Sequence, residues 1–346
     1  MRTHQENSDD KKVSILTQHL LNNYGGLLQN YALQHILKKM GCNVTTIDYL
    51  RTITFIPFWR YLLSCLKTIF LFLFLGKRRE FIRFSHKGRR SALTETFVSN
   101  CIETSFKCYR YKRNMLQKKD VVIVGSDQVW RPKYNYRIED MYLKFAENLP
   151  IKRIAYAASF GVNAWEYSPK QTLECSKLAK KFDAISVREE SGVKLCKEHL
   201  GVDATWVLDP TLLLTKEDYL PICEDVAVCN EKYIAVYVLD ENEDVTATYE
   251  KEAAARGLVV KKFHADSKST LTVPEWLAMF RDASYVVTDS FHGTVFSIIF
   301  GKEFKCIYNK GRGAARFESL MNLYNSGKLE EMREFSINWL RKALEK

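Results

Sequence analysis

The chain has 346 residues, 46% of them apolar, which is enough for about two domains with a hydrophobic core each. Its nine cysteines form no C-x-x-C pair and no zinc-like spacing, and no secretory signal precedes them, so we exclude a disulfide-stabilised fold and expect reduced thiols in the cytoplasm. The net charge of +11 is compatible with nucleic acid, a membrane surface or anionic substrates, so its position along the chain has to decide between them.

Strands and helices alternate through the first 208 residues. Residues 1–12 are polar and predict a disordered tail. Strands are predicted at 13–17, 43–49, 120–124, 153–158, 183–187 and 205–208, and helices at 26–40, 109–118, 168–181 and 189–199. Repeated βα units of this length predict a parallel sheet that helices cover on both faces.

An apolar and basic insertion at 55–90 interrupts this alternation. Its apolar run at 61–75 is shorter than the roughly 20 residues of a membrane span and contains Lys67. The cations that follow the run are Lys77, Arg78, Arg79, Arg83, Lys87, Arg89 and Arg90. Two interpretations stay open: the insertion docks on an anionic membrane leaflet, or it is a core helix followed by a solvated basic helix. Because no nucleic-acid-binding motif accompanies the charge, we expect no nucleic acid partner.

A second set of βα units follows a break near 209–230, where Pro210 and Pro221 interrupt the apolar rhythm. Strands are predicted at 233–239, 258–263, 284–288 and 304–308, and helices at 244–256, 273–281, after Ser290 and from 314 onward. We therefore predict an α/β protein of two doubly wound, Rossmann-like domains that face a cleft. The N-terminal domain covers 13–208, the C-terminal domain covers 209–330, and a last helix covers 331–346.

Polar residues follow the predicted strands at their carboxyl ends, where open α/β sheets bind ligands. They are Asn23, Tyr24 and Gly25, then Ser126, Asp127 and Gln128, then Arg188, Asp209, Ser290 and His292. His292 falls in the first turn of a predicted helix, where free N–H groups and the helix dipole favour a phosphate or carboxylate. The alternative for His292 is a histidine that only caps or packs the helix.

Five short motifs occur in a fixed order along the chain. They are Asn23-Tyr24-Gly25-Gly26, Gly125-Ser126-Asp127-Gln128, Ser186-Val187-Arg188-Glu189, Leu208-Asp209-Pro210-Thr211 and Ser290-Phe291-His292-Gly293. In this combination the chain resembles the polysaccharide pyruvyl transferase family, from about Val13 to about Leu323. The resemblance implies a fold like that of the two-domain glycosyltransferases (GT-B). It also implies phosphoenolpyruvate as the donor and, as the acceptor, a sugar of a surface polysaccharide such as a capsule or exopolysaccharide, or its lipid-linked precursor.

The same resemblance implies roles for individual residues. Arg188 would clamp an anionic group of the donor, and His292 would be the donor-site histidine, acting as acid or base. Lys310 would be a further donor contact, with Arg312 and Arg316 as alternatives in the same loop. Asp127 would be the general base or an acceptor-binding carboxylate, with a helix cap as its other interpretation. The remaining acceptor-side and helix-start residues are Asn23, Tyr24, Gly25, Ser126, Gln128 and Ser290.

Several motifs are absent from the sequence. It contains no D-x-D triad, no H-E-x-x-H, no P-loop and no G-x-S-x-G elbow, so we expect no metal and no cofactor beyond phosphoenolpyruvate as substrate. The expected location is the cytoplasm, on the inner leaflet of the plasma membrane if the insertion docks there. A nucleotide-sugar glycosyltransferase and a non-catalytic, membrane-associated assembly factor stay as alternative functions. The sequence leaves the oligomeric state, the acceptor sugar and the acid/base assignment between His292 and Asp127 open.

Overall fold

Six short apolar segments form the first parallel sheet, in the order β2-β1-β3-β4-β5-β6. The computed structural model describes residues 11–50, 62–63, 65–68, 90–105, 107–265, 269–307 and 314–345. The strands are β1 (Lys11–Leu16), β2 (Cys42–Thr46), β3 (Val121–Val124), β4 (Lys152–Ala158), β5 (Ala184–Val187) and β6 (Thr205–Trp206). All four residues of β3 are buried, as expected for a central strand covered on both faces.

Helices cover this sheet and connect its strands. The α-helices are α1 (Tyr24–Lys39), α3 (Ala92–Cys101), α4 (Pro169–Ala179) and α5 (Glu190–Leu195), and α5 continues into a π-helical turn at Cys196–Leu200. Three short 3-10 turns lie at Arg113–Leu116, Ile138–Tyr142 and Lys144–Ala146. Ser168 and Gln171 form a capping box at the start of α4, and Pro169 occupies its first turn, where a missing N–H group costs no helical hydrogen bond.

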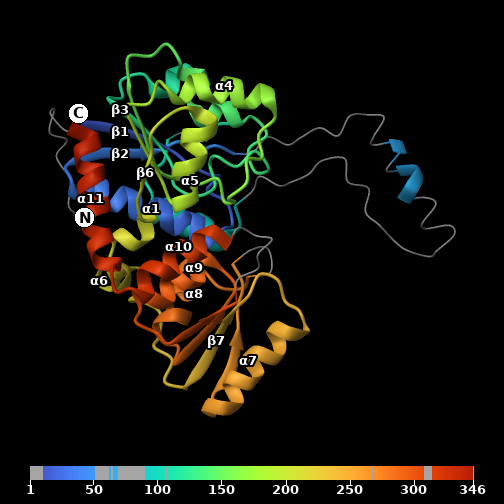
Figure 1. Cartoon of the computed structure of the whole chain (residues 1–346). Helices are drawn as coiled ribbons and strands as arrows, with labels where there is room; N and C mark the ends of the chain where they lie inside the picture. Colours follow the sequence, from blue (N-terminus) through green and yellow to red (C-terminus); the bar gives the residue numbers. More distant parts are fainter. Residues whose placement is uncertain are drawn as a thin grey trace.

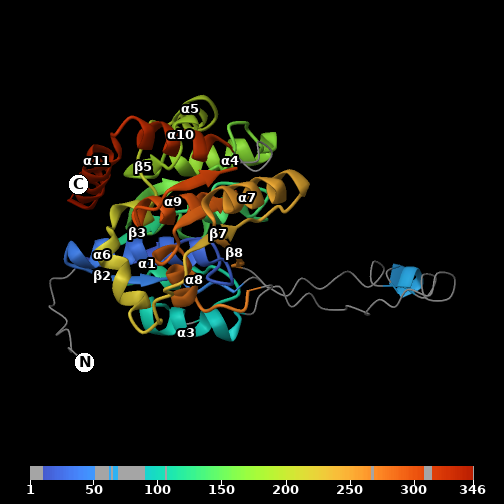
Figure 2. The ribbon, with the colours of Figure 1, turned by 90° about the horizontal axis from the view of Figure 1, so that it is seen from below.

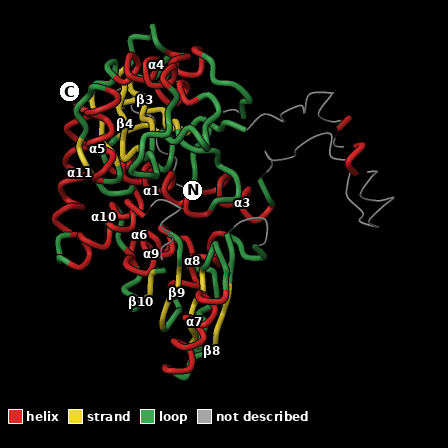
Figure 3. Tube along the Cα trace, turned by 45° about the vertical axis from the view of Figure 1, so that its right-hand side comes forward, coloured by secondary structure: helices red, strands yellow, loops and turns green. Residues whose placement is uncertain are grey.

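The second sheet has four parallel strands in the order β10-β9-β7-β8. Its strands are β7 (Tyr233–Tyr237), β8 (Val259–Lys262), β9 (Tyr285–Thr288) and β10 (Phe304–Cys306). Its helices are α7 (Glu243–Arg256), α8 (Val273–Arg281), α9 (Phe291–Ile299) and α10 (Ala314–Asn325). The linker between the two sheets forms the short helices Pro210–Leu213, α6 (Lys216–Tyr219) and Leu220–Cys223. Figures 1 and 3 show the two sheets toward opposite ends of the folded body, with α1, α6 and α9 between them.

Apolar side chains from both domains form one continuous core where the domains meet. Trp276 of α8 packs edge-on against Tyr24 of α1, with ring centroids 6.0 Å apart, and against Phe296 of α9 at 5.5 Å. The final helix, α11 (Leu329–Glu345), returns to the first domain, as Figures 1 and 2 show. There the ammonium groups of Lys11 and Lys152 donate hydrogen bonds to the carbonyl of Leu344, at 2.6 and 2.8 Å. The Trp276–Tyr24 contact thus joins the two domains, and the hydrogen bonds to Leu344 attach the C-terminal helix to the first.

The predicted α/β fold of two parallel-sheet domains facing a cleft is confirmed. Two local predictions are wrong, and one helix was missed. The first strand begins at Lys11, inside the predicted tail 1–12, because Lys11 and Lys12 pair with β2. The helix predicted at 109–118 is only the 3-10 turn Arg113–Leu116, and the chain is still extended just before it, where Cys108 forms an isolated parallel bridge with Tyr49. α3 was not predicted, and its N-cap, Ser91, makes no side-chain capping bond.

Most of the insertion at 55–90 lies outside the described residues, as do residues 1–10. Among the part that is described, residues 62–63 and 65–68 are helical, and Leu62, Leu63 and Leu66 are 45%, 57% and 58% exposed. None of the helices in the described ranges combines the length and hydropathy that a membrane crossing requires. The choice between membrane docking and core packing for 61–75 therefore stays a prediction.

Candidate functional site

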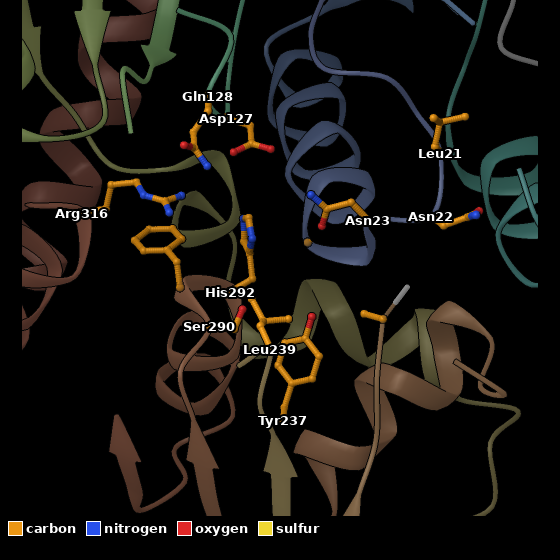
Figure 4. A pocket seen from close by; sticks show the side chains of 13 residues that line it. Leu21, Asn22, Asn23, Asp127, Gln128, Tyr237, Leu239, Ser290, His292 and Arg316 are labelled. Atoms are coloured by element: carbon orange, nitrogen blue, oxygen red, sulfur yellow. The ribbon is translucent and has the colours of Figure 1, made fainter. Parts of the chain in front are cut away.

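A cavity of about 480 Å³ lies between the two domains, at the carboxyl ends of strands from both sheets (Figure 4). This volume lies within the range of about 300–1,000 Å³ typical of small-molecule sites. The residues lining it are Leu21, Asn22, Asn23, Gly25, Asp127, Gln128, Tyr237, Leu239, Ala265, Ser290, Phe291, His292 and Arg316. Both domains therefore contribute to one site.

The N-terminal ends of two helices point into this cavity. Asn23 caps α1, where its side-chain oxygen accepts from the Gly26 N–H group at 3.2 Å. Ser290 caps α9 in the same way, accepting from the Gly293 N–H group at 3.4 Å. The first turns of both helices contain no acidic residue. Because the first N–H groups of a helix lack helical acceptors and carry the positive end of its dipole, the two ends together favour an anion.

His292 projects from the first turn of α9 into the cavity (Figure 4). It is buried, and its Nε2 atom has no hydrogen-bond partner among the described residues. Burial lowers the pKa of the imidazole, and the nearby charges of Asp209 and Asp127 only partly oppose this. The ring is therefore neutral at pH 7, with Nε2 available to a ligand as donor or acceptor.

Gly25 makes room for His292 across the domain boundary. A Cβ atom placed at Gly25 would lie 2.9 Å from the Cβ of His292 and closer still to its ring atoms Cγ and Nδ1. Real Cβ atoms are essentially never found within 3.0 Å of a heavy atom of a residue that is not a neighbour in the chain. The first turn of α1 therefore needs glycine at this position for the backbone to approach the histidine.

Arg188 joins two buried carboxylates behind the cavity wall. Its Nη1 donates to Asp209 Oδ2 at 2.6 Å, and its Nη2 donates to Asp127 Oδ1 at 3.2 Å. Burial alone would raise the pKa of both carboxyl groups, but the nearby positive charges, Arg188 foremost, and the hydrogen bonds to the carboxylates together outweigh it. The pKa of Asp127 is therefore lowered, and that of Asp209 is lowered to about 2. Both carboxylates are therefore ionised at neutral pH. Only Asp127 of these three residues lines the cavity.

A buried glutamine holds the loop that carries Asp127. The Gln29 side chain, on α1, accepts from the Ser126 N–H group at 3.2 Å and donates to Thr17 Oγ1 at 2.9 Å. Asp127 has φ = 68°, in the left-handed region that aspartate tolerates better than most residues. Ser126 turns its hydroxyl away from the cavity and donates it to Asp209 at 3.3 Å. Gln29 and Asp209 thus hold the loop on the side opposite the cavity, and the Asp127 carboxylate faces the cleft.

Two cations flank Phe291 at the edge of the site. The guanidinium carbons of Arg188 and Arg316 lie 4.9 and 5.4 Å from the centre of the Phe291 ring. Arg316, in the first turn of α10, is buried and lines the cavity. Burial and the Arg188 charge lower the pKa of Arg316 to about 10, so it stays a cation at neutral pH and gains from a nearby anion.

The structure brings together seven of the predicted site residues on the cavity wall: Asn23, Gly25, Asp127, Gln128, Ser290, His292 and Arg316. Tyr24 is instead buried between the domains and donates to the carbonyl of Leu271 at 2.5 Å. Ser126 and Arg188 lie behind the wall. Lys310 and Arg312 lie outside the described residues.

Sequence reasoning missed six residues of the wall: Leu21, Asn22, Tyr237, Leu239, Ala265 and Phe291. Leu239 could have been found from the carboxyl-end rule that located the others, because it lies two residues after the last residue of β7. Its loop is held by Asp289, whose carboxylate accepts from the N–H groups of Leu239 and Asp240 at 2.7 and 2.8 Å. Within the described ranges, no three His, Cys, Asp or Glu side chains are grouped so as to hold a metal ion.

Two parallel-sheet domains with an anion-favouring cleft between them define a two-domain α/β protein of the GT-B architecture. Residues 23–311 match the sequence model of the polysaccharide pyruvyl transferase family. The chain belongs to this family of transferases, and all five motifs from which the resemblance was drawn contribute residues to the cavity or to the ion pairs of Arg188 behind it.

Solved structures of similar overall form include nucleotide-sugar enzymes. UDP-GlcNAc 2-epimerase from Neisseria meningitidis, bound to UDP-GlcNAc, is 12% identical with a TM-score of 0.49, over 96% of this chain and 99% of that one. UDP-GlcNAc 2-epimerase from Methanocaldococcus jannaschii is 12% identical with a TM-score of 0.42, over 85% and 83% of the two chains. The wall teichoic acid polymerase TagF is 10% identical with a TM-score of 0.43, over 97% and 83%. A comparison with curated proteins found no match.

Proposed function

We propose that the protein transfers a pyruvyl group from phosphoenolpyruvate to a sugar of a surface polysaccharide or of its lipid-linked precursor. The product would be a pyruvate ketal, and phosphate would be released. The observation that carries the proposal is the buried His292, with an unpartnered Nε2, at the point where two helix N-terminal ends and the Arg316 cation converge. Family membership supports a transferase that acts on a saccharide.

Phosphoenolpyruvate carries a carboxylate and a phosphate, so its site needs two sources of positive charge. The N-terminal end of α9 with Ser290 and His292 offers one, and Arg316 at the edge of the cavity offers the other. Arg188 is held by Asp127 and Asp209 and does not line the cavity, which favours a positioning role over direct contact in this conformation. Lys310 and Arg312 stay proposed donor contacts on the family resemblance alone.

Ketal formation requires two additions to the same carbon of the donor. A proton adds to the methylene carbon of phosphoenolpyruvate and makes it a methyl group, and the neighbouring carbon becomes an oxocarbenium ion that the first sugar hydroxyl attacks. Phosphate then leaves, and the second hydroxyl attacks the carbon again. The sugar loses two hydroxyl protons in total. One of them replaces the proton that was added to the methylene carbon, and the other leaves with phosphate.

The geometry favours His292 as the base that removes a hydroxyl proton. Burial and nearby cations keep its imidazole neutral at pH 7, and in the tautomer protonated at Nδ1 the unpartnered Nε2 has a lone pair to accept that proton. Asp127 is a weaker base because Arg188 lowers its pKa, and we assign it to holding an acceptor hydroxyl and stabilising the oxocarbenium charge. Asn23, Gly25 and Gln128, on the opposite wall, would contact the acceptor.

A lipid-linked acceptor would bring the protein to the inner leaflet of the plasma membrane, and the exposed Leu62, Leu63 and Leu66 support an insertion that is not packed in the core at these residues. We therefore propose peripheral membrane association through 55–90 as part of this function. Docking would raise the local concentration of the acceptor.

Calorimetric titration of the purified protein with phosphoenolpyruvate tests the donor assignment. We expect binding by the wild type, loss of binding in His292→Gln, and unchanged binding in the matched variant His199→Gln. His199 stacks on Trp165 with ring centroids 4.4 Å apart and does not line the cavity, so it controls for replacing a histidine as such. Thermal unfolding of each variant checks that the fold is kept.

Titration with a nucleotide diphosphate is the contrasting experiment. Heat with the nucleotide and none with phosphoenolpyruvate would replace this proposal with a nucleotide-sugar glycosyltransferase. Absence of heat with both, also in the presence of the saccharide acceptor, would instead favour a non-catalytic assembly factor.

A further inference from the structure

The segment at 107–119 concentrates positive charge on the folded body of the first domain. It contains six Lys or Arg residues and no Asp or Glu. The exposed members that define what we call the basic face are Lys107, Tyr109, Arg110, Lys112 and Arg113. Tyr109 is 58% exposed among these cations. The basic face is distinct from the cations of the insertion at 55–90, from which membrane docking was predicted.

The basic face has a rigid support, because its backbone is bonded to the outer edge of β2. The Ser105 N–H group donates to the Thr46 carbonyl at 2.9 Å, and the Cys108 N–H group donates to the Asp48 carbonyl at 2.9 Å. Beneath the exposed cations, Tyr111 is buried and stacks on Tyr49 with ring centroids 4.3 Å apart. The charged side chains therefore extend from a fixed platform.

A shallow groove of about 670 Å³ runs across the basic face. The described residues that line it are Ser105, Lys107, Cys108, Tyr109, Arg110, Lys112, Asn114 and Met115, with three cations and no acidic side chain among them. Glu95 pairs with Lys107 at 3.0 Å and neutralises that charge. Arg110, Lys112 and Arg113 therefore supply most of the positive field. Such a field attracts a surface of negative charge.

The first residues of the basic face lie beside the carboxyl ends of β1 and β2, the end of the sheet at which the cavity opens, whereas Arg113 reaches the carbonyl of Asn148, before β4, at 3.4 Å. His19, which follows β1, stacks on Tyr49 at 4.9 Å, and Tyr49 stacks in turn on Tyr111. On the cavity side, Asn22 points away from the cavity (Figure 4) and its side-chain oxygen accepts from the Ser91 N–H group at 2.9 Å and the Thr94 hydroxyl at 3.0 Å. A short stack of rings and one asparagine thus connect the cavity wall with this edge of the domain.

The boundaries of the apolar and basic insertion lie at the same edge. The Leu50 N–H group, five residues before the insertion begins, donates to the Cys108 carbonyl at 2.7 Å. Arg90, at its end, pairs with the buried Asp48 carboxylate. Any partner held by the basic face therefore lies beside the residues that precede and follow the insertion.

We propose that the basic face docks on the headgroups of anionic membrane lipids, with the mouth of the cavity held next to the bilayer surface. The cations are spread over an exposed rim around one exposed tyrosine, which suits a charged sheet of headgroups with an interfacial aromatic residue. A small anion would need donors that converge in an enclosed pocket, as they do in the cavity. The purpose of the docking rests on the proposed lipid-linked acceptor, although the docking itself can be measured without it.

Sedimentation with lipid vesicles tests the proposal on the full-length protein. The two vesicle preparations are phosphatidylcholine alone and phosphatidylcholine mixed with phosphatidylglycerol. We expect binding only to the mixed vesicles, weakening with added salt. In the triple variant Arg110→Gln, Lys112→Gln and Arg113→Gln, affinity should fall roughly a hundredfold, from a factor of about five for each charge removed at a membrane surface.

The matched control removes three exposed lysines from the α4 region: Lys170→Gln, Lys177→Gln and Lys180→Gln. This control has the same net charge as the test variant, so we expect it to bind vesicles nearly as well as the wild type. Equal losses in both variants would mean attraction by net charge alone and would overturn the proposal. Wild-type vesicle binding in the test variant would overturn it too, as would loss of binding to an RNA oligonucleotide with vesicle binding unchanged.

Phosphoenolpyruvate titration of the same variants separates this inference from the proposed function. Both triple variants should bind phosphoenolpyruvate like the wild type, because none of the six side chains lines the cavity. If the wild type binds vesicles through the basic face but binds no phosphoenolpyruvate, the docking holds and the donor assignment fails.

Discussion

Gly25→Ala gives the sharpest test of how the two domains build the site. In the isolated α1 helix the change is favourable, because alanine is about 1 kcal/mol better than glycine inside a helix. In the folded protein the new methyl group would meet the Cβ of His292 at 2.9 Å and its ring even closer. A rotamer change of His292 moves the ring but leaves its Cβ in place, so the backbone of α1 or α9 has to shift.

The expected cost follows from these two effects. Overpacking at a close contact costs about 1–3 kcal/mol, and the gain in helix propensity offsets about 1 kcal/mol of it. The net change in the free energy of unfolding is therefore a loss of up to about 2 kcal/mol. Donor binding should suffer more, because the displaced groups are His292 and the α9 N-terminal end, and we expect affinity for phosphoenolpyruvate to fall at least about tenfold.

Gly26→Ala is the matched control for this substitution. It makes the same chemical change one residue along the same helix, but its new Cβ would lie 3.2 Å from Asn23 Nδ2, a contact that a small side-chain adjustment relieves. Calorimetric titration with phosphoenolpyruvate and chemical denaturation should be run on both variants. Wild-type donor affinity in Gly25→Ala would refute the close approach of α1 to His292 as a requirement of the site.

Four further outcomes follow from the buried groups of the site. Arg188→Met leaves two carboxylates buried without their partner and should reduce the free energy of unfolding by about 3–5 kcal/mol, measured by denaturation; a loss below about 1 kcal/mol would contradict a paired arrangement. With His292 as the base, kcat/KM should rise with pH along a limb centred below the ordinary histidine value of about 6.5, because burial lowers its pKa, and a limb above that value speaks against this role. Asp209 has its folded-state pKa lowered to about 2, so its stabilisation is complete above its unfolded value of about 3.9 and is lost as the pH falls toward 2; denaturation at pH 5 and pH 3 should show this loss in the wild type and less of it in Asp209→Asn. Gln29→Leu removes the acceptor of the N–H group just before Asp127 and should cost about 1–3 kcal/mol of stability, with a larger effect on kcat than on the KM of the donor if the glutamine positions the catalytic loop.

The alternation of apolar runs and capping signals in the sequence was sufficient to predict both parallel sheets. Strand ends and caps are local: Ser290 before His292, and Thr272 with Glu275 at the start of α8, are capping patterns readable within four residues. The carboxyl-end rule then placed Asp127 and Gln128 at the ligand-binding edge of the first sheet and His292 at that of the second, because strands of a parallel sheet all end on the same side. These predictions needed no knowledge of long-range contacts.

The tertiary structure decided which of these polar side chains face a ligand and which support the wall. The family resemblance predicts that Arg188 clamps an anionic group of the donor, yet its guanidinium lies in a buried pair with Asp127 and Asp209. The sequence could not show this pair, because only folding brings the ends of β3, β5 and β6 together. The approach of Gly25 to His292 joins residues far apart in the sequence and in different domains, and no local pattern encodes it. The sequence by itself therefore determined the βα framework and the side of each sheet on which chemistry occurs. The packing of the two domains decided the shape of the cavity, the charge state of its histidine and the partners of its carboxylates, because burial and distance exist only in the folded chain.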